Sequence, residues 1–117
     1  LIWDIRRNLH MKYFPVNKAV LQINITDAPK KTSNWWFIFD GKERPDVGYL
    51  DPSLDVDLYI ETSLSSLTKI WLGASTHSTE NKAGNFQIEG SQKMIDTFES
   101  WFGSSNFASI QKFAMAS

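Results

Sequence analysis

A run of carboxylates in the middle of the chain is the part of the sequence best suited to acid-base chemistry. Asp55, Asp57 and Glu61 occur within the alternating segment LDVDLYIET (54–62), and Asp51 precedes them. In a strand, alternation would place the first three on one face, where neighbouring carboxylates can act as general acid and base. The simpler interpretation is a solvated face of a half-buried sheet. We therefore expect no catalytic residue and no enzymatic activity.

Metal binding and nucleophilic catalysis find little support in the sequence. The two histidines are His10 and His77, and neither has a second ligand at a spacing typical of metal sites. The chain contains no cysteine, no G-x-S-x-G nucleophile motif and no glycine-rich phosphate loop. We predict neither a metal site nor a cofactor.

Charge and hydropathy restrict the partners of this segment. The formal net charge is -1, and the basic residues are scattered, so we expect no direct binding of nucleic acid. No stretch approaches the ~20 apolar residues of a membrane span, so stable membrane insertion is not expected. The absence of cysteine is compatible with a reducing compartment, and we expect a cytoplasmic protein.

Aromatic side chains give the strongest remaining signal. The 117 residues include five tryptophans and eight phenylalanines. Near the end of the chain, Met94, Ile95, Phe98, Trp101 and Phe102 fall on a single helical stripe. Such a stripe can pack into a filled core or cover an apolar pocket, and periodicity does not distinguish the two.

Hydrophobic periodicity predicts one α+β domain. The expected elements are a helix over 2–9, strands over 18–26, 35–40, 47–51 and 54–62, a helix over 64–73, an exposed loop over 74–84, a strand over 85–89, and a helix over 91–101 that ends at Gly103. This order predicts a single mixed sheet of about five strands, with a three-strand meander followed by a crossover strand, and helices packed on one face.

Several segments resemble a known family. LDVDLYIETSLSSLTKIWLG (54–73), followed by GNFQIEGSQKMIDTFESWFG (84–103), resembles the sterol carrier protein type 2 (SCP2) domain. The motifs IWDIRR, ITDAP, the WW pair and SWFGSSNFA resemble the version found C-terminal to the winged helix of HxlR-type bacterial transcriptional regulators. The resemblance extends from Leu1 to Ala108.

The resemblance implies a cavity between sheet and helices, which the wider family uses for lipids, sterols or fatty acyl groups. It offers no catalytic residue to transfer. Carried onto this sequence, the wall of the cavity would consist of Val56, Leu58, Ile60, Trp71, Phe86, Ile88, Met94, Phe98, Trp101 and Phe102.

The resemblance also implies a domain division and a function. Residues 1–15 would form a helix at the junction to a missing winged-helix domain, 16–108 the SCP2-like domain, and 109–117 a C-terminal tail. DNA would then be contacted only through the missing domain. We expect a ligand-sensing domain that binds a small apolar or lipid-like molecule. The alternatives are a structural module that forms a homodimer without ligand, and a stand-alone lipid or sterol carrier.

Overall fold

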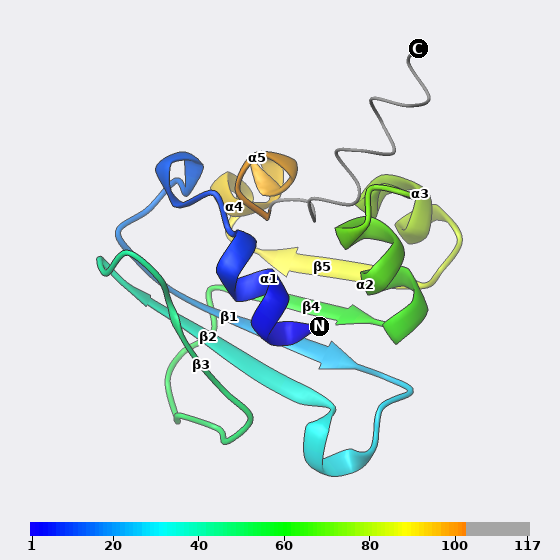
Figure 1. The fold of residues 1–117 in the computed structure, drawn as a ribbon, viewed down its shortest axis with the longest axis horizontal. Coiled ribbons are helices and arrows are strands. Elements are labelled where there is room, and N and C mark those ends of the chain that lie inside the picture. The colour runs from blue at the N-terminus through cyan, green and yellow to red at the C-terminus, as the bar shows by residue number, and fades with distance from the viewer. Residues whose placement is uncertain (103–117) are drawn as a thin grey trace.

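A five-stranded mixed sheet carries the helices of this protein on one face (Figure 1). The computed structural model describes residues 1–102. The elements are, in chain order, α1 (Ile2–Asn8), the 3₁₀ helix η1 (Met11–Tyr13), β1 (Lys18–Ile25), η2 (Lys30–Thr32), β2 (Asn34–Asp40), β3 (Asp46–Gly48), β4 (Leu58–Thr62), α2 (Leu64–Trp71), α3 (His77–Lys82), β5 (Phe86–Gly90), α4 (Gln92–Asp96) and α5 (Phe98–Phe102).

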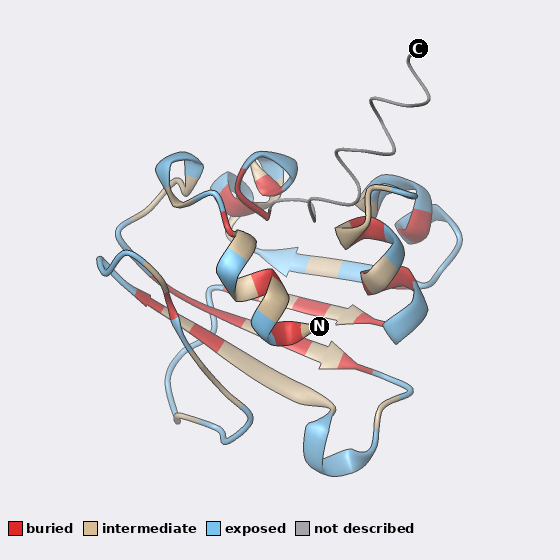
Figure 2. Cartoon of the chain, viewed as in Figure 1, coloured by how far each residue is buried: buried red, intermediate tan, exposed pale blue. Residues whose placement is uncertain are grey.

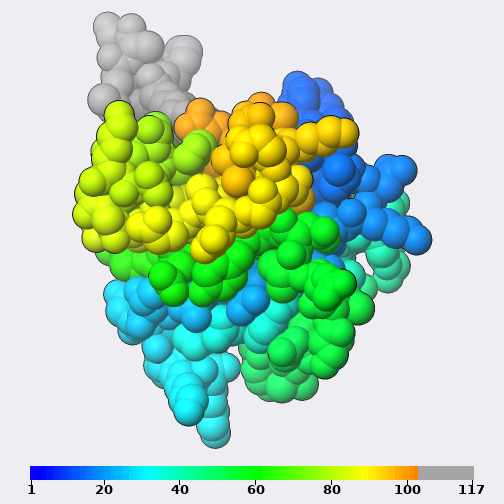
Figure 3. Space-filling view, turned by 180° about the vertical axis from the view of Figure 1, so that it is seen from behind, coloured from blue at the N-terminus to red at the C-terminus, as the bar shows by residue number. Residues whose placement is uncertain are grey.

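The strand order is β3-β2-β1-β4-β5. β1 pairs antiparallel with β2 and parallel with β4, and β5 pairs antiparallel with β4. The first three strands form a meander, and residues 49–57 then carry the chain past β2 and β1 to β4. Part of this crossover segment is visible in green on the rear surface in Figure 3. The predicted α+β class, meander and crossover strand are confirmed.

Alternation along β1 determines which face of the sheet receives the helices. Leu21 and Ile23 are buried and pair laterally with Leu58 and Ile60 of β4. The intervening Gln22 lies on the opposite, partly exposed face, where its amide donates to Asn34. Figure 2 shows the resulting mixture of buried and partly exposed positions along β1 and β4. The hydrophobic face of the sheet therefore lies beneath the helices.

The first helix is an integral part of the core. Its apolar residues Ile2 and Ile5 are buried, as is Leu9 directly after it. The next backbone amide, that of His10, donates to the carbonyl of Trp101 in α5 at 2.9 Å. The predicted helix over 2–9 is confirmed, with its last residue at Asn8.

Two segments differ from the sequence prediction. The polar stretch 74–84 contains helix α3, capped by the Thr76 hydroxyl, which accepts from the backbone amide of Thr79. The single helix expected over 91–101 is interrupted at Thr97 and forms the two short helices α4 and α5. The predicted end at Gly103 lies outside the described residues. Short polar helices such as α3 have weak periodicity, which explains why the sequence pattern does not reveal them.

Two of the strands are shorter than predicted. β3 covers Asp46–Gly48 instead of 47–51, and β4 begins at Leu58 instead of residue 54. The difference arises because the crossover segment runs without strand pairing until it reaches β1. The pattern predicts Thr62 or Ser63 as the cap of α2 and Ser91 as the cap of α4, and the structure has Ser63 and Ser91 in these positions. Within the described residues, no helix is long and apolar enough to cross a membrane.

Gly90 lets the chain pass closely over the start of β4. Its φ is +126°, and a Cβ at this position would overlap the backbone carbonyl oxygen of Asp57. Gly84 has a φ of +82° but faces open space, with no atom within 4 Å of an added Cβ. A side chain at position 84 would therefore introduce backbone strain alone, whereas a side chain at position 90 would introduce both strain and overlap with Asp57.

We predict that Gly90→Ala destabilises the protein by about 3 kcal/mol or more, because strain and overlap with backbone add together. Gly84→Ala should cost about 1 to 2 kcal/mol, the cost of the left-handed conformation alone. Urea denaturation followed by circular dichroism measures both values. Equal destabilisation by the two substitutions would contradict the predicted overlap.

Candidate ligand-binding site

Most residues predicted to line a cavity lie together beneath the helices. Leu58 and Ile60 point from β4 into the core, and β5 contributes Phe86 and the partly buried Ile88. Ile60 and Ile88 are direct neighbours across the two strands. The sheet thus provides a continuous apolar floor at β4 and β5.

Helices α4 and α5 cover this floor with bulky side chains. Met94, Phe98, Trp101 and Phe102 are all 3% exposed or less. The Phe98 ring stacks on Phe102 at 4.6 Å between centroids and meets the edge of Trp101 at 5.2 Å. It also lies 6.0 Å from the ring of Phe86 in β5. A ligand bound beneath α4 and α5 would have to replace some of these aromatic contacts.

Trp101 connects this cover to the N-terminal part of the chain. Its ring meets Phe14 edge-on at 5.2 Å, and Phe14 stacks on Phe39 of β2 at 4.1 Å. The indole Nε1 donates to the carbonyl of Met94 at 3.1 Å, which joins α5 to α4 across the break at Thr97. Such edge-to-face and stacked pairs are favourable arrangements of aromatic rings.

Trp71 lies at the C-terminal end of α2 and packs, partly buried, against the same core. Its indole Nε1 is buried and has no hydrogen-bond partner among the described residues. Sequence reasoning selected this residue as part of the wall but gave no sign of its unpaired nitrogen, because hydrogen-bond partners depend on the tertiary structure.

Val56 does not belong to the predicted wall. It is 38% exposed and lies in the crossover segment, before β4 begins. For Val56 to share the buried face with Leu58, β4 would have to begin at least two residues earlier. The next residue, Asp57, also lies before β4, and its backbone amide and its carboxylate both hydrogen-bond to the backbone of Val20. Val56 is therefore left outside the paired region, on the surface.

The predicted row of carboxylates also does not form. Of Asp55, Asp57 and Glu61, only Glu61 lies in β4, and Asp55 is exposed in the crossover. The Asp57 carboxylate accepts the Val20 amide at 2.8 Å, which is a structural role. Within the described residues, no three His, Cys, Asp or Glu side chains are grouped closely enough to hold a metal ion.

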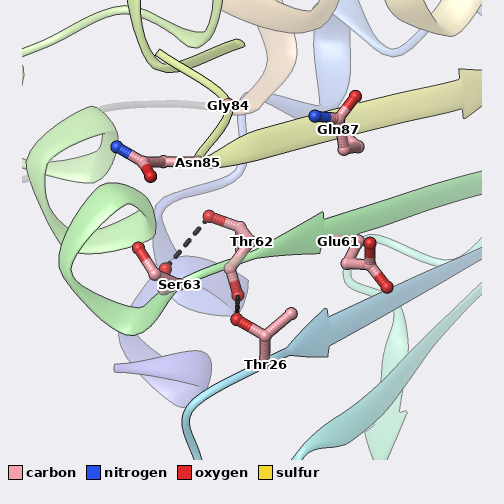
Figure 4. Close-up of a pocket in the computed structure, with 7 residues that line it drawn as sticks. All are labelled: Thr26, Glu61, Thr62, Ser63, Gly84, Asn85 and Gln87. Atoms are coloured by element: carbon pink, nitrogen blue, oxygen red, sulfur yellow. Dashed lines mark hydrogen bonds between the residues drawn. The ribbon is translucent and has the colours of Figure 1, made fainter.

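A polar pocket lies at the end of β4 and the start of β5, beside the start of α2 (Figure 4). Its volume is about 130 Å³. It is lined by Thr26, Glu61, Thr62, Ser63, Gly84, Asn85 and Gln87. Ligand pockets for drug-sized molecules usually exceed about 300 Å³. This pocket is too small and too polar to be the predicted apolar cavity, and sequence reasoning did not anticipate it.

Solved structures share this arrangement of sheet and helices. The apo form of sterol carrier protein 2 from Yarrowia lipolytica aligns with a TM-score of 0.58 and 17% identity, over 85% of this chain and 84% of that chain. The UbiJ-SCP2 ubiquinone synthesis protein aligns with a TM-score of 0.57 and 16% identity, over 85% and 74%. The chain has the sterol carrier protein 2 fold.

The same fold occurs within a larger enzyme. The inverting sec-alkylsulfatase Pisa1 from Pseudomonas sp. aligns with a TM-score of 0.62 and 16% identity, over 86% of this chain and 15% of the sulfatase chain. No protein-family model and no curated protein matches the sequence. Because these structures share only 16–17% sequence identity with the chain, the similarity confirms the sterol carrier protein 2 fold alone. The HxlR context stays a prediction.

A buried carboxylate holds α3 to α2 in this sterol carrier protein 2 fold. Glu80 is 6% exposed, and its two oxygens accept from the hydroxyls of Ser66 and Ser75, both at 2.6 Å. The Ser66 hydrogen bond, followed by that of Ser75, lowers the pKa of Glu80 below its ordinary value of 4.5. Sequence reasoning missed this residue because it placed 74–84 in an exposed loop. The helix cap at Thr76 was the available signal.

We predict that Glu80→Gln lowers stability near pH 7, and that the loss shrinks at acidic pH. A carboxyl whose pKa is depressed by folding stabilises the native state above its unfolded pKa, and this contribution disappears as the pH falls through the folded pKa. Urea denaturation between about pH 7 and about pH 3 tests this. Glu43→Gln, at an exposed turn, is the control. A difference between wild type and Glu80→Gln that does not change with pH would contradict the prediction.

Proposed function

We propose that this chain binds a small apolar or lipid-like molecule between the sheet and the cover formed by α4 and α5. We further propose that it is the effector-binding domain of a cytoplasmic transcriptional regulator, with residues 1–15 joining it to a winged-helix domain. DNA would be contacted by that domain. The binding proposal rests on one observation: α4 and α5 are held over the sheet mainly by apolar side-chain contacts.

The cover is held mainly by apolar contacts. α4 and α5 have five residues each, and their buried side chains are hydrophobic. Among the described residues, α5 has one backbone hydrogen bond to a distant segment, from His10 to Trp101. Its Glu99 also lies 3.6 Å from Nδ1 of His77. An apolar ligand could therefore take the place of the side-chain packing when the cover opens, while few hydrogen bonds would have to break.

The contacts of Trp101 connect the proposed ligand site to the segment after α1. Its carbonyl binds the amide that follows α1, and its ring packs on Phe14. A ligand that displaces α5 would change the support of α1, which the proposed winged-helix domain would precede. Coupling of this kind requires that the ligand bind the two arrangements with different affinity.

A second candidate function, a structural module that pairs two copies, is favoured by the crossover segment. This segment exposes four large apolar side chains within eight positions: Tyr49 (55%), Leu50 (75%), Leu54 (49%) and Val56 (38%). Contiguous exposed apolar surface is typical of interaction sites. A stand-alone lipid carrier is the other alternative, and it would bind its ligand at the same site as the sensor.

We predict that native mass spectrometry of the purified chain shows one lipid-like adduct per protein, which solvent extraction releases. Phe98→Ala should lose the adduct because it removes the ring that contacts α5 and β5. Trp36→Ala is a control for aromatic truncation, since Trp36 pairs with Gln22 on the opposite face of the sheet. Circular dichroism would verify that both variants fold.

A bare dimer mass, together with no binding of added dodecanoic acid, would contradict the ligand-binding proposal and favour the pairing module. This outcome depends on the wild type alone, so it remains decisive even if Phe98→Ala does not fold.

A further inference from the structure

We propose that the ligand is an amphiphile whose head carries an oxygen acceptor, and that the Trp71 indole N–H binds this oxygen. The inference rests on the proposed function, since it assigns the polar end of a molecule in the same site. The indole N–H would make a molecule with an oxygen acceptor bind more tightly than a pure hydrocarbon of the same length.

The unpaired nitrogen of Trp71 is the observation behind this inference. An indole Nε1 can only donate a hydrogen bond, and water satisfies it when it is exposed. In Trp71 this atom is buried and has no acceptor among the described residues. A buried donor without a partner destabilises a folded protein, and most such groups in native structures are satisfied. A bound ligand with an acceptor would satisfy it.

In two other tryptophans, the indole N–H has a backbone carbonyl as its acceptor. Nε1 of Trp101 donates to the carbonyl of Met94 at 3.1 Å, and Nε1 of Trp35 donates to that of Thr32 at 2.9 Å. Nδ1 of His77 is also buried without a hydrogen bond, but the Glu99 carboxylate lies 3.6 Å from it. Among these side chains, Trp71 is the one whose donor has no candidate acceptor within the described chain.

Trp71 packs against the same apolar core as the buried side chains of α4 and α5. Leu67, Ile70 and Trp71 follow helical spacing, and all three belong to or pack against the core above the sheet. α2 lies on the same face of the sheet as α4 and α5 (Figure 1). An apolar chain could therefore lie under the cover while its oxygen reaches the indole at the end of α2.

The test compares three probes of equal chain length: dodecanoic acid, dodecanol and dodecane. Their binding to wild type, Trp71→Phe and Trp3→Phe is measured by displacement of a fluorescent fatty acid. Phenylalanine keeps an aromatic ring and removes the N–H. Trp3→Phe is the matched control because Trp3 is 53% exposed on α1.

We predict that Trp71→Phe binds the acid and the alcohol about tenfold more weakly than wild type, the effect of one lost hydrogen bond. Dodecane should bind wild type and Trp71→Phe equally, and Trp3→Phe should match wild type with every probe. In two-dimensional NMR, the Trp71 indole N–H resonance should move downfield on addition of the acid or the alcohol, and not on addition of dodecane.

The two proposals fail in different ways. Unchanged affinity of Trp71→Phe for the acid and the alcohol, with an unmoved indole resonance, would overturn the role of Trp71 and leave the apolar site intact. Failure of all three probes to bind wild type would overturn the proposed site, and the assignment of its polar end with it.

Discussion

Asp57 joins four parts of the fold at one point. Its backbone amide donates to the carbonyl of Val20 in β1, and its carboxylate accepts the Val20 amide at 2.8 Å. Its carbonyl accepts the amide of Ser91, the cap of α4, also at 2.8 Å. Gly90 leaves no Cβ in the space above that carbonyl. These contacts fix where the crossover ends, where β4 begins and where the chain turns from β5 into α4.

The position of the cover follows from this junction. Because α4 begins at Gln92, directly after its cap Ser91, Met94 is buried in the core, and the break at Thr97 turns α5 back toward the segment after α1. Two helices of five residues each have little stability of their own. The cover therefore depends mainly on its apolar and aromatic contacts with the rest of the core, which are the contacts that an apolar ligand can replace.

Strong periodicity made much of the fold predictable. β1 alternates regularly, and α2 has an apolar stripe, a serine cap and Gly73 with a φ of +76° at its end. α3 was missed because tertiary hydrogen bonds to Glu80 hold it, and these leave no periodic pattern. Val56 was misplaced because local alternation continues beyond the point where strand pairing stops. Local pattern thus predicts elements better than their limits.

The candidate site was predictable in composition and not in detail. Its apolar residues were identified from their spacing and from the family resemblance. The hydrogen bond from Nε1 of Trp101 to Met94 depends on the break between α4 and α5. The missing partner of Nε1 of Trp71 depends on atoms distant in sequence. Burial of a donor is a property of three-dimensional packing. One sequence provides the residue type and leaves its partner unknown.

The most direct measurement is amide hydrogen exchange of the wild-type chain, with and without dodecanoic acid. If α4 and α5 form a cover that opens to admit a ligand, their amides should exchange faster than those of β1 and β4 in the free protein, and the acid should slow them. Equally slow exchange of α4, α5, β1 and β4, unchanged by the acid, would contradict a cover that opens.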